Sequence, residues 1–182
     1  MLGTLEIERE GMRKEKGFSL IELLIVVAII LIIAAIAVPN LLRSRMAANE
    51  SSAAASLRTI DTANVTYSST YNVGYAGNLT ALAPSTSPTS TAADLLDSVL
   101  GLSVPVKSGY SFAYLATQAT PTPAAPNPSF TVVATPVGPG SSGQSTFCTD
   151  QTNVVGRDTD GSTVSSPSAS TCGFSTTTFG PL

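Results

Sequence analysis

A long apolar run near the N-terminus constrains the fold of this chain more than any other feature. The run extends from Phe18 to Val38, and of its 21 residues fifteen are Leu, Ile, Val or Phe, four are Ala, and two are Ser19 and Glu22. As a helix rising ~1.5 Å per residue, it would be about 31 Å long, which matches the hydrocarbon core of a bilayer. The large side chains contribute about −6 kcal/mol to insertion, and a carboxylate near one end costs less than the ~3 kcal/mol of a central charge. The run is therefore predicted to cross a membrane despite Glu22.

Basic residues precede this run and predict its orientation. Arg13, Lys14 and Lys16 lie just before it, so the positive-inside tendency keeps the N-terminus in the cytoplasm and exports everything after Pro39. Three other interpretations of the run stay open. It could be a buried core helix, a secretory signal cleaved at the small residues 35–37, or a plain membrane anchor.

The composition of the 182-residue chain disfavours catalysis and nucleic-acid coating. Nine basic and twelve acidic residues give a net charge of −3, and the chain has two Cys and no His. The lack of His excludes a Ser-His or Cys-His pair, and two Cys cannot form a Cys₄ metal site. The carboxylates of Asp150, Asp158 and Asp160 could in principle hydrolyse a glycoside, but they fall in expected turns without an aromatic subsite. We therefore expect no enzyme activity, catalytic residue, metal or cofactor, and no specific nucleic-acid site.

The beginning of the apolar run carries a specific motif. Positions 16 to 30 read Lys-Gly-Phe-Ser-Leu-Ile-Glu-Leu-Leu-Ile-Val-Val-Ala-Ile-Ile, directly after a basic leader. This stretch, continued to Arg45 with Pro39 at the expected spacing, resembles the N-terminus of type IV pilins and type II secretion pseudopilins. The resemblance implies an α+β type IV pilin fold. In that fold a long N-terminal helix, transmembrane in its first half, packs on a small antiparallel β-sheet head.

The resemblance also implies roles for individual residues. A membrane-embedded prepilin peptidase would cut between Gly17 and Phe18 and would methylate the new amine of Phe18. Phe18, Glu22 and Pro39 would serve subunit assembly, with the Glu22 carboxylate pairing with the N-terminal amine of a neighbouring subunit. A carboxylate in hydrocarbon is costly unless it is paired or protonated, which fits this role. An unpaired acid that reaches the membrane interface is the alternative.

The function implied by the resemblance is that of a structural subunit of a type IV pilus, serving motility, adhesion or DNA uptake. A type II secretion pseudopilin that drives protein export is the alternative, and a membrane-anchored or secreted binding domain is a remote one. The implied partners are further copies in a helical filament, the inner membrane, the prepilin peptidase and a pilus or secretion assembly platform. The precursor would be a single-pass protein of the bacterial inner membrane with its head in the periplasm. The mature chain would lie in an extracellular pilus or a periplasmic pseudopilus.

Cleavage after Gly17 divides the chain into four expected segments. They are a leader (1–17), a transmembrane and assembly half of the helix (18–38), an amphipathic half (39–72) and a β-rich head with a C-terminal disulfide loop (73–182). The stretch from Met12 to Gly17 would itself be a leader of charge +2, and the residues before it add three acids against one base. An alternative start of translation at Met12 would make residues 1–11 a start-site artefact.

An amphipathic pattern extends the helix beyond Pro39, to about Tyr71. Apolar positions recur at intervals of mostly three, four or seven: Leu42, Met46, Ala53, Leu57, Ile60, Tyr67 and Tyr71. Charged residues are expected largely on the other faces: Arg43, Arg45, Glu50 and Arg58. Pro39 removes one backbone hydrogen bond and is expected to kink or loosen the helix. The resemblance implies that this stretch can melt in an assembled filament.

The second half of the chain is expected to form the β-rich head. Residues 78–88 are predicted as a loop anchored by Leu79 and Leu82. Residues 92–100 are predicted as a short helix with Asp94 in its first turn. Three antiparallel strands are predicted over 109–117, 129–137 and 146–157. The side chains of Tyr67, Tyr71 and Tyr75 are expected to pack between helix and sheet.

Cys148 and Cys172 are the only cysteines, and both lie in the exported part. An oxidising periplasm favours a disulfide, which would close a loop of 25 residues and contribute roughly 3.5 kcal/mol in the chain-entropy model. Such a bridge resembles the C-terminal disulfide loop of many pilins, and two free thiols are the alternative. The stretch 158–161 (Asp-Thr-Asp-Gly) is interpreted as a tight turn, because a calcium loop needs further ligands. The Ser- and Thr-rich tail, 162–182, is expected to be a surface loop or a partly mobile segment.

Overall fold

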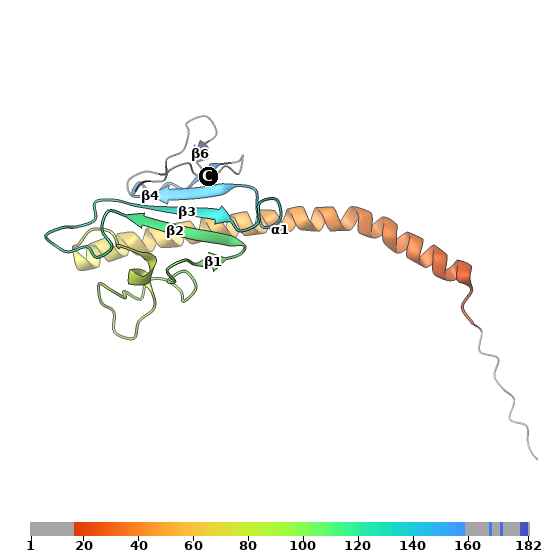
Figure 1. Ribbon diagram of the computed structural model, residues 1–182, viewed down its shortest axis with the longest axis horizontal. Coiled ribbons are helices and arrows are strands. Elements are labelled where there is room, and N and C mark those ends of the chain that lie inside the picture. The colour runs from red at the N-terminus through yellow and green to blue at the C-terminus, as the bar shows by residue number, and fades with distance from the viewer. Residues whose placement is uncertain (1–16, 159–167, 169–171, 173–178, 182) are drawn as a thin grey trace, which may run out of the picture. The chain divides into compact units, whose positions relative to one another are not determined.

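The computed structural model describes residues 17–158, 168, 172 and 179–181. In chain order they form one long helix, a short 3₁₀ helix and six strands (Figure 1). The residues up to Asn40 and those from Leu41 onward form two compact units, each described here by itself. The long helix, α1, contributes to both units.

Helix α1 spans Leu20–Tyr71 and confirms the predicted helix to within two residues at its start. It ends where Asn72 adopts φ 54°, a left-handed conformation that commonly terminates helices, while its amide still donates to the carbonyl of Ser68 at 3.1 Å. The helix is continuous through Pro39. The expected loosening at Pro39 is therefore not seen in the free subunit. The alternative, a kink at Pro39, stays a prediction, as does melting in a filament.

The six strands form one antiparallel sheet in which each strand pairs with the next along the chain. The strands are β1 (Val106–Lys107), β2 (Tyr110–Ala116), β3 (Phe130–Pro136), β4 (Thr146–Asp150), β5 (Gly156–Asp158) and β6 (Phe179–Pro181). Strands β2 and β3 confirm the first two predicted strands, and the long helix with its antiparallel sheet confirms the α+β fold. The sheet has twice the expected number of strands, because β1, β5 and β6 have only two or three residues and leave no detectable alternation in the sequence.

The third predicted strand, 146–157, is wrong as a single element. The chain reverses direction between β4 and β5 at a tight turn, where Asn153 has φ 58° and donates its amide to the carbonyl of Asp150 at 2.9 Å. The Asp150 carboxylate also accepts hydrogen bonds from the amide and the hydroxyl of Thr152, at 2.9 and 2.7 Å. Asp and Asn stabilise turns in this way, and the apolar residues that follow concealed the turn in the sequence pattern.

Residues 92–100 do not form the predicted helix. Asp94 has φ 56°, which is incompatible with the first turn of a right-handed helix. The amides of residues 93–96 donate to the carbonyls of residues 81–83, at 2.9–3.1 Å, instead of along their own segment. These carbonyls lie at the end of η1 (Leu79–Leu82), a 3₁₀ helix within the expected 78–88 loop. The expected anchors Leu79 and Leu82 are confirmed as buried.

The hydrophobic core lies between the second half of α1 and the facing side of the sheet (Figure 1). Its largest buried side chains are those of Leu57, Ile60, Tyr67, Leu79, Leu82, Leu100, Tyr110, Phe112, Phe130, Val132 and Phe147. The expected tyrosine packing is confirmed by ring pairs between Tyr67 and Tyr71 at 4.9 Å and between Tyr75 and Phe130 at 4.8 Å. Leu42 belonged to the apolar pattern but is exposed, because the buried stretch of α1 begins only at Ala53.

The core predicts a clear difference between two positions of α1. Leu57 is fully buried, so Leu57→Ala should lower the free energy of unfolding of the head by about 3 kcal/mol. Val65 is 47% exposed on the same helix, so Val65→Ala should change it by less than about 0.5 kcal/mol. Urea unfolding of the full chain in detergent micelles, followed by the near-UV circular dichroism of the buried tyrosines, measures both. Equal losses would contradict the assigned core.

Candidate functional site

An exposed segment leads into α1. Gly17 and Phe18 precede the helix, and Phe18 is 82% exposed. Apart from Gly17 and its two chain neighbours, no described residue has an atom within 4 Å of the position that a Cβ on Gly17 would occupy. The Gly17–Phe18 bond is therefore open to a peptidase, and cleavage there stays a prediction.

Glu22 contributes to the N-terminal cap of its own helix. Its carboxylate accepts a hydrogen bond from the backbone N–H of Ser19 at 2.9 Å. Since Ser19 directly precedes the first helical residue and Glu22 follows three positions later, this contact is one half of a capping box. The Ser-x-x-Glu spacing is a sequence signal for such a cap. In the free subunit the carboxylate thus has a local partner before it meets any other chain.

The first half of α1 presents apolar side chains in every direction. Each Leu, Ile and Val from Leu20 to Leu42 is between 45% and 79% exposed. This half of α1 is not buried within the described residues, and by length and composition α1 is long and apolar enough to cross a membrane. An apolar surface of this extent requires lipid or protein to cover it.

The Glu50 side chain connects α1 to the sheet. The sequence pattern placed Glu50 on a face of the helix away from the sheet, and this expectation is wrong. One carboxylate oxygen accepts hydrogen bonds from the amides of Gln144 and Ser145, at 2.9 and 3.1 Å. The other pairs with the guanidinium of Arg157 in β5 at 3.0 Å. The Nε of Arg157 in turn donates to the Ser145 hydroxyl at 2.9 Å. The helical pattern could not reveal this contact, because the partners lie about a hundred residues further along the chain.

A second carboxylate, Asp61, is buried between α1 and the sheet. One oxygen accepts a hydrogen bond from the hydroxyl of Thr149 in β4 at 2.8 Å, and the other has no hydrogen-bond partner among the described residues. Burial raises the pKa of Asp61 to about 6; Thr149 lowers it, the charge of Asp150 raises it, and that of Arg58 lowers it. Ionised Asp61 therefore weakens the head at neutral pH. The sequence shows that Asp61 lies between apolar residues of the helical pattern, but it does not show that the Asp61 side chain is buried.

Polar side chains also hold the loop that follows α1. The Tyr114 hydroxyl lies 2.8 Å from both the Asn64 side-chain oxygen and the Ala76 carbonyl, either of which can accept its proton. The same Asn64 oxygen accepts the Ala76 amide at 3.1 Å. Burial raises the pKa of Tyr114, so its hydroxyl stays a neutral donor. These contacts fix the chain direction after the helix ends, so that the loop can return to the sheet.

The expected disulfide is confirmed. Cys148 in β4 is bonded to Cys172, with their Cα atoms 5.8 Å apart. Of the expected turn at 158–161, Asp158 lies in β5, and the other three positions fall outside the described residues, as does most of the 162–182 tail. Within the described part of the chain, no group of three or more His, Cys, Asp or Glu is placed to hold a metal ion.

Comparison with known proteins bears on the N-terminal segment. Residues 12–38 match the family model described as the prokaryotic N-terminal methylation motif. This range contains the end of the basic leader, the Gly17–Phe18 pair, Glu22 and the whole apolar run. Together with the long helix and the antiparallel sheet, the match supports a relation of this chain to type IV pilins and pseudopilins.

One curated relative supports the same assignment. The chain is similar to the type IV wide pilus major component PilA4 of Thermus thermophilus, with 64% identity over 39 residues. These residues make up 21% of this chain and 30% of the relative, so the match spans less than a third of either protein. No solved structure matches the chain.

The burial of Asp61 predicts a pH dependence of stability. Because the pKa of Asp61 is raised from 3.8 to about 6, the folded head binds this proton more tightly than the unfolded chain does. Its contribution to the free energy of unfolding should therefore fall by on the order of 3 kcal/mol as the pH rises from about 4 through 6. The variant Asp61→Asn should lose this part of the pH slope, whereas Asp94→Asn, at an exposed position, should keep it. Urea unfolding of the full chain between pH 4 and 8 measures the slopes, and an unchanged slope in Asp61→Asn would refute the assignment.

Proposed function

We propose that this chain is the main structural subunit of a type IV pilus. The observation that carries the proposal is the exposed apolar half of α1, most of which lies within the methylation motif and which is followed by a folded head. In the membrane, lipid covers this surface, and in a filament the same surface of neighbouring copies covers it. Because one apolar environment replaces the other, a subunit can leave the bilayer without exposing the helix to water.

Processing precedes assembly in this proposal. A prepilin peptidase cuts the exposed Gly17–Phe18 bond on the cytoplasmic side and methylates the amine of Phe18, leaving residues 18–182. The precursor is anchored in the bacterial inner membrane by residues 18–38, with residues 39–72 and the 73–182 head on the exported side. An assembly platform then extracts the mature chain into the filament. The relative from Thermus thermophilus is by name a pilus major component, which supports a pilus role for this chain. In this proposal the filament serves motility, adhesion or DNA uptake.

Glu22 has two successive partners in this scheme. In the precursor it accepts the Ser19 amide and caps α1. After cleavage, the N-terminal amine of a neighbouring subunit becomes available, and an ionic partner inside a filament stabilises a carboxylate more than one neutral amide does. The exchange of partners favours one axial register between successive subunits. Pro39 allows the helix to adapt at the point where the apolar half ends.

The direct test is the N-terminal peptide of filaments sheared from cells, read by mass spectrometry. We expect a pelleted chain that begins at N-methylated Phe18. If that chain stays in the cell envelope and never pellets, the protein acts in a periplasmic pseudopilus instead. A mature end near Val38 would mean an ordinary secretory signal and would end the filament proposal.

Two substitutions separate the pairing role of Glu22 from its capping role. Glu22→Gln keeps a side-chain acceptor for the Ser19 amide but removes the charge. It should therefore be inserted and cleaved normally but give at least tenfold less filament. Ser19→Ala removes the N-cap hydroxyl and keeps the charge, so its yield should stay near that of the wild type. Yields are measured by quantifying sheared filaments, and a normal yield from Glu22→Gln would exclude the pairing role.

A further inference from the structure

The head carries two different surfaces at opposite edges of its sheet. Strand β1 forms one edge, and β5 with β6 forms the other. Helix α1 contacts both sides: the Ser52 hydroxyl meets that of Ser108 beside β1 at 2.9 Å, and Glu50 pairs with Arg157 of β5. The two surfaces are therefore fixed relative to each other within one folded unit.

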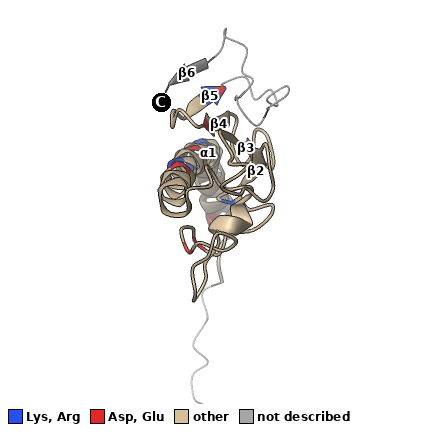
Figure 2. Cartoon of the chain, turned by 90° about the vertical axis from the view of Figure 1, so that its left-hand side faces the viewer, with Lys and Arg blue, Asp and Glu red and all other residues tan. Residues whose placement is uncertain are grey.

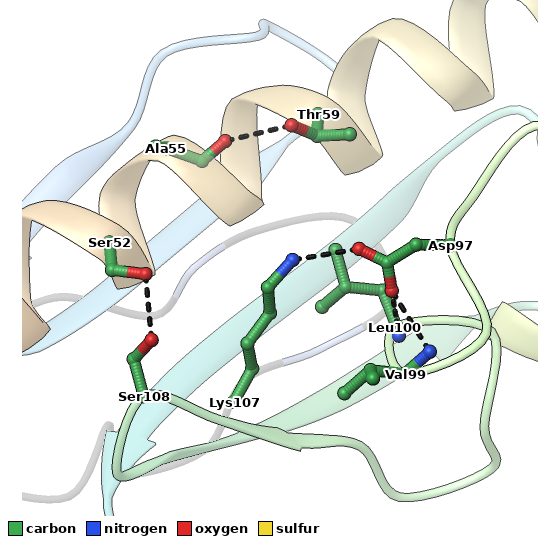
Figure 3. Close-up of polar contacts among 8 residues, drawn as sticks. All are labelled: Ser52, Ala55, Thr59, Asp97, Val99, Leu100, Lys107 and Ser108. Atoms are coloured by element: carbon green, nitrogen blue, oxygen red, sulfur yellow. Dashed lines mark hydrogen bonds and ion pairs between the residues drawn. The ribbon is translucent and has the colours of Figure 1, made fainter.

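The surface beside β1 is apolar and bordered by acids. It consists of Val99, Leu102, Val104 and Val106, which are 40%, 53%, 67% and 54% exposed. We call these four residues the valine patch. Asp97 beside the patch is already engaged, because it binds Lys107 at 2.7 Å and accepts the amides of residues 99 and 100 (Figure 3). The carboxylate of the exposed Asp94 lies in the same loop and pairs with no cation among the described residues.

The surface beside β5 is a groove with an apolar floor and a basic rim. Its volume is about 520 Å³, and Ala47, Ala54 and Phe147 line it together with Arg58 and Arg157. We call it the arginine groove. A smaller hollow of about 210 Å³ continues it toward Arg43. The groove therefore offers apolar contact and positive charge side by side.

The charges of the two surfaces are complementary. The arginine groove and its extension contain three arginines and one acid, Glu50, which is occupied by Arg157. Neither Arg43 nor Arg58 forms an ion pair with any described residue, although the charge of Arg58 acts on the buried Asp61. Beside the valine patch, two aspartates face one lysine. Figure 2 shows basic and acidic positions along α1 beside β5, and acidic positions in the loop on the other side of α1.

We propose that the valine patch of one subunit docks into the arginine groove of a second copy of this chain. Apolar side chains of the patch cover the Ala47, Ala54 and Phe147 floor, and the neighbouring aspartate side lies against the arginine rim. Because the two surfaces differ and lie at opposite sheet edges, the contact is heterologous and each copy leaves one of its two surfaces open for the next. This inference rests on the proposed filament function and names the head surfaces that would meet.

Disulfide cross-linking tests the contact in filaments. Ala47 and Val104 are both exposed, so the double variant Ala47→Cys with Val104→Cys keeps the core intact. After mild oxidation, non-reducing electrophoresis should show a ladder of dimers, trimers and longer chains. The matched control, Ala55→Cys with Val104→Cys, carries one cysteine at an exposed α1 position that does not line the groove, and it should give no ladder.

The outcomes distinguish this contact from the filament function itself. Filaments that form without a ladder in Ala47→Cys with Val104→Cys overturn the docking proposal and leave the filament function standing. Dimers from Val104→Cys alone would mean that two patches meet each other, which also overturns it. If the wild-type chain forms no filament of any kind, the proposed function fails and the docking proposal fails with it.

A charge variant gives an independent readout. Arg58→Glu, at an exposed position on the groove rim, should lower the filament yield at least tenfold, whereas Arg58→Lys should retain most of it. Adding Asp94→Lys to Arg58→Glu should recover more filament than Arg58→Glu alone gives. A normal yield from Arg58→Glu would contradict the charged part of the contact.

Discussion

The need to cover the apolar surface of one helix organises this protein. From Ala53 to Tyr67, one face of α1 is buried by the sheet and its loops, and this burial forms the core of the head. From Leu20 to Leu42 the same helix is more apolar, and its large side chains are 45–79% exposed. Hydrophobic burial therefore acts twice along one helix, once within the chain and once between the chain and its surroundings.

Polar contacts determine how the covered half of α1 sits on the sheet. Glu50 and Arg157 hold its first turns, Asp61 and Thr149 its middle, and Asn64 and Tyr114 its end. The three contacts differ in energy. The Glu50 carboxylate is satisfied by three donors, whereas Asp61 keeps one oxygen without a partner among the described residues. The buried Asp61 carboxylate thus joins helix to sheet through Thr149, but at neutral pH its charge lowers the free energy of unfolding of the head.

The order of the sheet gives the head two unlike edges. Because each strand pairs with its sequence neighbour, the first and last strands become the two borders. The chain leaves β5 at Asp158 and is joined to the sheet again by the Cys148–Cys172 bridge and by β6. Exposed valines lie beside the β1 edge, and arginines of β5 and α1 lie beside the other edge. Unlike edges suit assembly in one direction.

The sequence by itself determined the long helix, with its uniformly apolar first half and its amphipathic second half. It also determined two long strands and the disulfide. These features depend on local periodicity, on a motif of adjacent residues or on the number of cysteines, which a linear chain displays directly. The sequence could not determine the turn that splits 146–157 or the three short strands. It also could not show that residues 92–100 form no helix, because the amides of residues 93–96 donate to the carbonyls of residues 81–83 and not to carbonyls within their own segment. Only the tertiary structure decided that Glu50 and Asp61 face the sheet and that valines and arginines border opposite edges. The physical reason is that burial and ion pairing depend on distances in space between residues far apart in the chain, and those distances exist only once the chain is folded.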